Sequence, residues 1–329
     1  MTTRPTCIDL FAGAGGLSLG LKLAGWRTLV ASDYDRAACE TYRRNFDGVD
    51  VVEGDVRGTS WKGLRGKVDL VAGGPPCQPF SVAGNQMAHE DERDMLPEFV
   101  RAIREIRPQL LLMENVAGLT TTRNLPYLET RLDELRELGY DLHFKVLNAA
   151  DYGVPQERMR VIVMGGLKLR PQFPRASHGT KARPHVAARA ALADVPEDEP
   201  NRAIITYAKN PVIRPSPWAG MLVNGGGRPI NLAEPSQTIP ASAGGNRTHI
   251  LDASGVLLDY HSYLLSGGRP RNGIVPSVRR LTVRESARLQ SFPDGFHFCG
   301  ERSAKYRQVG NAVPPLLGKA VGKALINSL

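Results

Sequence analysis

Short apolar runs alternate with amphipathic stretches over the first 165 residues. The apolar runs predict strands, namely TCIDLF (6–11), RTLVASD (27–33), DVVEGD (50–55), KVDLVAGG (67–74) and QLLLMEN (109–115), with two more near 140–149 and 159–166. The segments 96–103 and 125–135 instead carry apolar side chains at the i, i+3, i+4, i+7 spacing of a helix face. Strands that alternate with helices predict an α/β fold with a doubly wound, mostly parallel sheet, and the apolar run QLLLM fits a sheet covered on both faces.

The pattern changes after about residue 167. Of the 24 prolines, 15 lie in residues 151–305, among Gly-rich clusters such as NGGGRP (224–229) and SGGRPRNG (266–273), which predicts a loop-rich second domain with short strands. Near its end LTVRESARLQSF (281–292) predicts a helix that Thr282 and Glu285 begin as a capping box. We therefore predict one domain from residues 1–166 plus 305–329, and a smaller domain from residues 167–304.

The segment VPPLLGKAVGKAL (313–325) predicts a last helix, because a proline pair suits a helix N-terminus. We expect this helix to pack back on the N-terminal sheet. Its predicted buried face consists of Leu316, Leu317, Ala320, Val321 and Ala324.

The net charge of +9 is unevenly distributed over the 329 residues. Residues 1–150 hold 18 basic and 21 acidic residues, residues 151–305 hold 21 and 12, and the last 24 hold three basic residues and no acidic one. A positive second half suits nucleic-acid phosphates, although a GC-rich genome would also raise the Arg content. No apolar run reaches the length of a membrane-spanning helix, and the four widely spaced cysteines predict neither a metal site nor a disulfide framework. These features predict a cytoplasmic protein without membrane association.

A Gly-rich turn, DLFAGAGGLSLGL (9–21), follows the first predicted strand. Gly13, Gly15 and Gly16 allow a tight turn and close approach of a ligand, although such turns also occur without one. The turn lacks the Gly-Lys-Ser/Thr of a phosphate-binding loop and has Ser18 where a dinucleotide fingerprint needs its third Gly or Ala, which disfavours a dinucleotide oxidoreductase. Phe11 offers a stacking face for adenine, Asp33 suits ribose hydroxyls, and Asp55 suits an adenine amino group.

Three further segments carry candidate catalytic groups. In GGPPCQPFS (73–81) two prolines precede Cys77, a rigid setting that is unusual for a structural cysteine. Glu114 follows the apolar run LLLM, where burial would favour an acid role; a helix cap or an ion pair is the alternative. Arg158 and Arg160 precede or begin a strand and are expected to point to the same side, with a surface ion pair as the alternative.

Taken in order, DLFAGAGG, GGPPCQPFS, ENV, QERMR and QVGNAV (308–313) resemble the motifs of the cytosine-C5 DNA methyltransferases. SDYDRAACETYRRNF (32–46), GDV (54–56) and RRLTVRESARLQSFPD (279–294) are similar to further motifs of this family, so that the resemblance covers about 1–166 and 279–320. The family usually has Glu where Asp33 stands, and Thr238-Ile239 replaces its usual Thr-Leu or Thr-Val pair.

The resemblance implies a methyl transfer from S-adenosyl-L-methionine, with S-adenosyl-L-homocysteine as product and no metal. It implies Cys77 as the nucleophile that adds to cytosine C6, with Glu114, Arg158 and Arg160 around the base. It also implies a cofactor site formed by Phe11, Ala14, Gly16, Asp33, Tyr34, Asp55, Val56, Pro76, Leu96, Asn311 and Val313. The implied partner is double-stranded DNA, bound by a protein that acts as a monomer.

For the DNA contacts, the candidates are Arg93, Arg228, Thr238, Arg247, Arg269 and Arg271. Segment 81–94 is interpreted as a loop that closes over a flipped base, the alternative being an ordinary surface loop. The compact length favours the modification half of a prokaryotic restriction system, with a possible cognate endonuclease. Two alternatives stay open: a tRNA cytosine methyltransferase, although RPQFPRASHGT (170–180) lacks the Cys-Phe-Thr segment usual there, and a catalytically silent DNA-binding relative.

Overall fold

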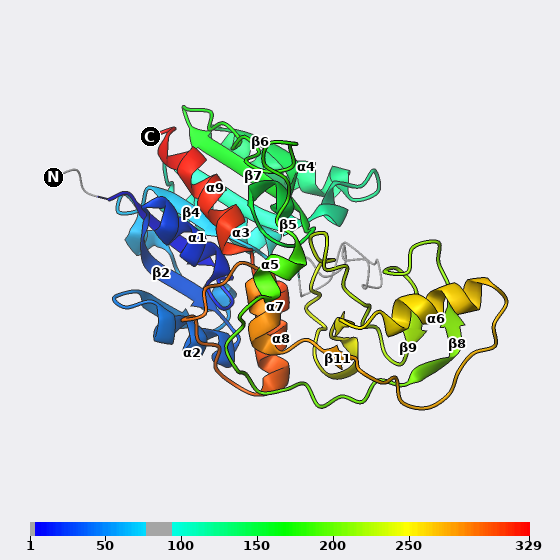
Figure 1. Ribbon diagram of the computed structural model, residues 1–329. Helices are drawn as coiled ribbons and strands as arrows, with labels where there is room; N and C mark the ends of the chain where they lie inside the picture. The colour runs from blue at the N-terminus through cyan, green and yellow to red at the C-terminus, as the bar shows by residue number, and fades with distance from the viewer. Residues whose placement is uncertain (1–3, 77–93) are drawn as a thin grey trace. The chain divides into compact units, whose positions relative to one another are not determined.

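A computed structural model describes residues 4–76 and 94–329 in two compact units (Figure 1). The first unit comprises Met1–Gly153, Arg158–Gly179 and Ala312–Leu329, and the second comprises Val154–Glu157 and Thr180–Asn311. Cys77, Arg93 and nearly all of the predicted loop 81–94 lie outside the described residues.

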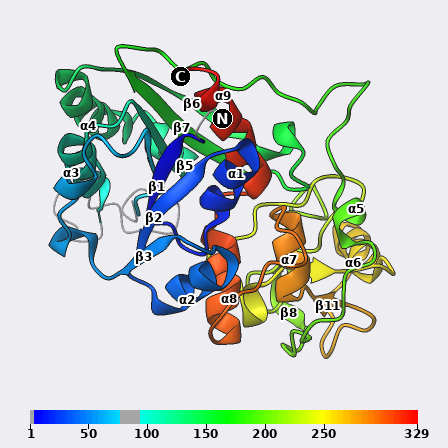
Figure 2. The ribbon, with the colours of Figure 1, turned by 90° about the vertical axis from the view of Figure 1, so that its left-hand side faces the viewer.

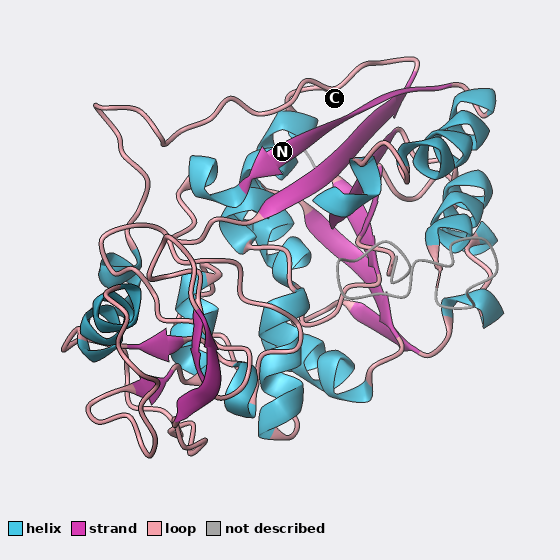
Figure 3. Ribbon diagram, turned by 90° about the vertical axis from the view of Figure 1, so that its right-hand side faces the viewer, coloured by secondary structure: helices cyan, strands magenta, loops and turns pink. Residues whose placement is uncertain are grey.

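A seven-stranded sheet forms the centre of the first unit (Figure 3). Its strands are β1 (Thr6–Leu10), β2 (Arg27–Asp33), β3 (Asp50–Glu53), β4 (Leu70–Gly73), β5 (Leu110–Val116), β6 (Tyr140–Asn148) and β7 (Met159–Leu167), in the order β3-β2-β1-β4-β5-β7-β6. The first five are parallel, and β7 runs antiparallel to both β5 and β6. The predicted strand set and the mostly parallel, doubly wound sheet are thus confirmed.

Helices cover both faces of this sheet, because its central strands are apolar on both sides. They are α1 (Gly16–Ala24), α2 (Arg36–Asn45), α3 (Leu96–Ile106), α4 (Leu125–Glu137) and α9 (Pro315–Ile326). Figure 2 shows α3 and α4 on one side of the sheet and α1 and α9 on the other. The main core cluster joins Phe99 of α3 and Leu132 of α4 to Ile8 and Leu111 of the sheet, as the helical spacing in 96–103 and 125–135 predicts.

The C-terminal helix α9 packs against α1, nearly 300 residues earlier in the chain (Figures 1 and 2). The Trp26 indole N–H donates to Gly322 O at 2.9 Å and ties the end of α9 to the start of β2. The predicted return of the last helix is confirmed, but its predicted face is only partly right. Leu317, Val321 and Leu325 are buried together with Pro315, Gly318 and Gly322, whereas Leu316, Ala320 and Ala324 are only partly buried.

The second unit contains short strands, as predicted, and more helix than predicted. Its elements are α5 (Ala188–Leu192), β8 (Tyr207–Val212), β9 (Met221–Val223), β10 (Ile250–Leu251), α6 (Val256–Leu265), β11 (Arg279–Arg280), α7 (Val283–Leu289) and α8 (Arg302–Asn311). Helix α7 lies within the predicted 281–292, and helices α6 and α8 were not expected. A small core of its own, which includes Leu222, Ile250 and Tyr260, supports this unit.

The sequence predicted domain boundaries between residues 166 and 167 and between residues 304 and 305, and the limits of the two compact units differ from these positions. The chain stays with the first unit as far as Gly179, where the backbone N–H groups of Ser177 and His178 donate to Asp151 O. Helix α8 belongs to the second unit. The division into a catalytic and a recognition domain stays a prediction. Among the described residues, no helix is long and apolar enough to cross a membrane.

Candidate active site

The turn between β1 and α1 adopts left-handed backbone conformations at Phe11 (φ 58°), Gly13 (φ 53°) and Gly15 (φ 87°). A Cβ atom on Gly15 would lie 2.5 Å from the Phe46 ring, so this position excludes any side chain. A Cβ on Gly13 would meet nothing within 4 Å, so the space above that residue is open. The turn therefore leaves its backbone accessible to a ligand at the carboxyl edge of the sheet.

Asp33, at the end of β2, supports this turn. Its Oδ2 accepts the Gly13 N–H at 2.7 Å, and its Oδ1 accepts the Asp35 N–H at 2.9 Å. Burial raises the pKa of the carboxyl group, which the two N–H donors partly oppose. Next to it, the Tyr34 side chain is 73% exposed. Asp33 thus orders the turn, and its contact with ribose hydroxyls stays a prediction.

Asp55 follows β3 at the same edge of the sheet. It caps the short 3-10 helix η1 (Val56–Gly58), accepting the Arg57 N–H at 2.9 Å, and it pairs with the Arg57 guanidinium, which lowers the pKa of the exposed carboxyl group. The side chain of Val56 is buried, as is that of Leu96 at the start of α3. Pro76 O accepts the Met95 N–H at 3.1 Å. Apart from Val313, which precedes α9, the candidate cofactor residues of the first unit therefore lie at or just beyond the ends of β1 to β4 and at the start of α3.

Glu114 and Arg160 form an ion pair between β5 and β7. Because β7 is antiparallel to β5, its first residues lie beside the last residues of β5, with Val116 opposite Arg160. Arg160 Nε lies 2.8 Å from Glu114 Oε1, although the geometry is not that of a hydrogen bond. A Cβ on Gly74 would lie 3.4 Å from Glu114 Oε2, which places the carboxylate against the end of β4.

Arg158 is almost completely buried, which excludes the surface ion pair considered for it. Its Nη2 donates to Ala312 O at 3.0 Å, and its backbone N–H donates to Asn148 Oδ1 at 3.2 Å. Burial lowers its pKa well below the usual value, and the positive charge of Arg160 adds to this effect. Val313, also buried, follows Ala312. The first unit thus brings the guanidinium groups of Arg158 and Arg160 and the carboxylate of Glu114 together near the carboxyl end of β5.

The sequence did not single out Asn115. The Asn115 Nδ2 donates to Pro75 O at 3.0 Å and so fixes the backbone two residues before Cys77. Its position next to Glu114 in the segment ENV was the available signal. A second missed group is Asp9, which accepts a 2.6 Å hydrogen bond from the Ser18 hydroxyl beneath the Gly-rich turn.

The remaining candidates that the structure describes, those for DNA contacts and the cofactor candidate Asn311, lie in the second unit. Thr238 Oγ1 donates to Glu157 O at 2.7 Å, and Arg228 is partly buried, while Arg247 and Arg269 are exposed. The Arg271 guanidinium stacks 4.9 Å from the ring centre of Tyr263. Asn311 is exposed at the end of α8.

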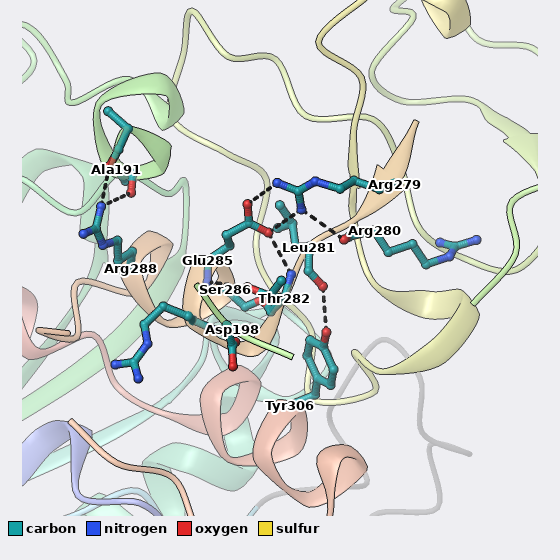
Figure 4. A network of polar contacts seen from close by, with 12 residues as sticks. Ala191, Asp198, Arg279, Arg280, Leu281, Thr282, Glu285, Ser286, Arg288 and Tyr306 are labelled. Carbon is teal, nitrogen blue, oxygen red and sulfur yellow. Dashed lines mark hydrogen bonds and ion pairs between the residues drawn. The ribbon is translucent and has the colours of Figure 1, made fainter. Parts of the chain in front are cut away.

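A polar network organises the start of α7 in this unit (Figure 4). Glu285 accepts hydrogen bonds from both terminal nitrogens of Arg279 and from the backbone N–H of Thr282, whose hydroxyl accepts the Glu285 N–H in return. The predicted capping box is thereby confirmed. Tyr306 donates to Leu281 O at 2.6 Å. The segment 279–294 therefore stabilises the second unit.

A family model for C-5 cytosine-specific DNA methylases matches residues 5–327. The chain belongs to this family. The methylase is 33% identical to the Type II methyltransferase M.XorII of Xanthomonas oryzae pv. oryzae, over 99% of this chain and 86% of that protein. It is also 33% identical to the Type II methyltransferase M.NgoMIV of Neisseria gonorrhoeae, over 98% of each chain.

Solved structures confirm the methyltransferase fold of this methylase. A putative DNA modification methyltransferase encoded within an E. coli prophage aligns with a TM-score of 0.69 at 23% identity, over 98% of this chain and 99% of that one. A mutant of DNMT2 from Spodoptera frugiperda aligns with a TM-score of 0.71 at 18% identity, over 98% and 99% of the two chains. At these identities the likeness concerns the fold alone.

Proposed function

We propose that this methylase transfers a methyl group from S-adenosyl-L-methionine to C5 of a cytosine within a specific sequence of double-stranded DNA. The observation that carries the proposal is the Glu114–Arg160 pair at the carboxyl end of β5, where Glu114 lies beside Gly74, three residues before Cys77 in the sequence. A carboxylate and a guanidinium at one edge suit the amino group, N3 and O2 of a cytosine.

The first unit offers a fitting site for the cofactor. The open space above Gly13 and the accessible turn suit close approach of a ligand, and Asp33 and Asp55 follow the next two strands along the sheet. Phe11, Ala14, Gly16, Tyr34, Val56, Pro76, Leu96 and Val313 would complete it. When bound, S-adenosyl-L-methionine supplies an electrophilic methyl group.

Cys77 would activate the base. Cytosine C5 is a weak nucleophile until a thiolate adds at C6 and makes the ring an enamine. An ordinary thiol has a pKa of about 8.5 and is only a few per cent ionised at pH 7, so the reaction needs positive charge nearby. Arg158 and Arg160 would supply that charge, and Arg158 would also contact the base near O2. Glu114 would hold N3 and the amino group and share a proton with N3. Removal of the C5 proton then lets the thiolate leave.

A duplex hides the reacting face, so the target base would be flipped out, at a cost of a few kcal/mol. Segment 81–94, including Arg93, would close over it. Arg228, Thr238, Arg247, Arg269 and Arg271 would contact the DNA, and phosphate contacts would provide most of the affinity. We expect the protein to act on DNA as a monomer in the cytoplasm of a prokaryote. The names of its relatives support a role in protecting host DNA from a cognate restriction endonuclease.

Transfer of tritium from labelled S-adenosyl-L-methionine to duplex DNA tests the proposal. We expect wild type and the matched control Cys299→Ser to label DNA, and Cys77→Ser to be inactive. Wild type should also form a covalent adduct with duplex DNA that contains 5-fluorocytosine. Active enzyme without that adduct would exclude the thiolate mechanism.

Two outcomes would favour the other candidate functions. Labelling of tRNA but not of DNA would identify a tRNA methyltransferase. DNA binding without labelling of either nucleic acid would identify a catalytically silent relative.

A further inference from the structure

Arg101 of α3, a partly buried residue, binds a segment far away in the sequence. Its Nη2 donates to Val56 O at 2.8 Å, and its Nη1 donates to Thr59 O at 3.1 Å. Val56 is the first residue of η1, the three-residue 3-10 helix that follows Asp55, and Thr59 comes directly after its last residue. Since so short a helix has few hydrogen bonds of its own, external donors decide where it lies.

Two carboxylates hold the Arg101 guanidinium in place. Glu98 accepts from Nε at 2.7 Å, and Glu105 accepts from Nη1 at 2.8 Å. Glu105 also accepts the Trp61 N–H at 2.7 Å, at the other end of the same segment. The planar fork of an Arg side chain can serve carboxylates and carbonyl groups at once, which a Lys ammonium group cannot do in the same geometry.

The segment held in this way carries two of the proposed cofactor residues. Asp55 caps η1, and the Val56 side chain lies in the same core cluster as Trp61. Helix α3 itself begins with Leu96, a third proposed cofactor residue. We infer that Arg101 is a positioning residue for the adenine end of the cofactor site, because it fixes the backbone that places Asp55 and Val56. This inference rests on the proposed S-adenosyl-L-methionine site.

The alternative is a purely structural ion-pair cluster on a helix. Such a cluster would stabilise α3 without affecting how the protein distinguishes one ligand from another. A positioning role instead predicts a change at the adenine 6-amino group, which Asp55 is proposed to bind. The two roles therefore differ in ligand discrimination, and this difference does not depend on overall stability.

Isothermal titration calorimetry with S-adenosyl-L-homocysteine tests the inference. We expect Arg101→Gln to weaken binding about tenfold, the size expected for loss of one hydrogen bond to a charged group. The affinity of Arg101→Lys for S-adenosyl-L-homocysteine should lie between those of wild type and Arg101→Gln. Arg104→Gln is the matched control, because Arg104 lies on the same helix and pairs instead with Glu134 of α4 at 3.3 Å. This variant should bind like wild type. In steady-state assays Arg101→Gln should raise KM for the cofactor and leave kcat and KM for DNA within twofold.

A second ligand keeps the test decisive even if the variants are less stable. The purine analogue of S-adenosyl-L-homocysteine lacks the 6-amino group, so wild type should bind it more weakly, and Arg101→Lys and Arg101→Gln should distinguish the two ligands less well. Wild-type discrimination in both Arg101 variants would overturn the inference. Failure of wild type to bind S-adenosyl-L-homocysteine at all would instead refute the proposed cofactor.

Discussion

Replacing Gly20 by Ala tests how the two ends of the chain pack together. Gly20 lies on the face of α1 that contacts α9. A Cβ atom at this position would lie 2.6 Å from Pro315 O and 2.7 Å from both Cα and the carbonyl carbon of Gly318. All three are backbone atoms, which cannot rotate away, so the helices must separate.

The size of the effect follows from two opposing terms. Ordinary contacts begin near 3.4 Å, so the closest approach is short by roughly 0.8 Å. Overpacking of this kind costs about 3 kcal/mol at the upper end of its usual range. The greater helix propensity of Ala over Gly returns about 1 kcal/mol. We therefore expect Gly20→Ala to lower the free energy of unfolding by about 2 kcal/mol.

Urea unfolding followed by far-ultraviolet circular dichroism measures this change. Gly63→Ala is the control, because a Cβ on Gly63 would meet nothing within 4 Å, and its stability should stay within about 0.5 kcal/mol of wild type. Since α1 begins directly after the Gly-rich turn, Gly20→Ala should also raise KM for the cofactor. Stability equal to or above that of wild type would refute the packing argument, because helix propensity alone predicts an increase.

Further predictions concern a buried carboxyl group, a helix cap and the basic second unit. Burial raises the pKa of Asp9 from 3.8 to about 7, so the folded state binds the proton more tightly than the unfolded state does. The stability contributed by Asp9 is therefore complete below pH 4 and is lost as the pH rises to 7. Across this pH range, the free energy of unfolding of Asp9→Asn should rise by up to about 4 kcal/mol relative to that of wild type. A difference in thermal unfolding between the two proteins that does not change with pH would contradict this. Thr282→Ala should cost about 1 kcal/mol in urea unfolding through loss of the α7 cap, and an unchanged midpoint would show that the cap is dispensable. Arg247→Glu with Arg269→Glu should weaken DNA binding and reduce the slope of log K against log salt by about 2, and an unchanged slope would exclude phosphate contacts there.

Local patterns were sufficient for most elements of the first unit. Strand β2 spans the predicted residues 27–33, and the helical spacing in 96–103 and 125–135 lies within α3 and α4. The order of the motifs was sufficient for the family as well, which the match over residues 5–327 confirms. These features depend on residues close together in the sequence, where spacing and turn chemistry decide the structure.

Tertiary structure decided the features that depend on distant residues. The predicted face of the last helix contained no glycine, but Gly318 and Gly322 are buried against α1, where a Cβ atom on Gly322 would lie 2.9 Å from Ala24 Cβ. Ser18, the departure from a dinucleotide fingerprint, is fully buried and donates to Asp9.

The pairing of Glu114 with Arg160 likewise required the strand order, which places β7 antiparallel beside β5. The sequence by itself determined most strands and helices of the first unit and the family to which the chain belongs. The partner of Glu114 follows from a contact between neighbouring strands, which no local spacing encodes.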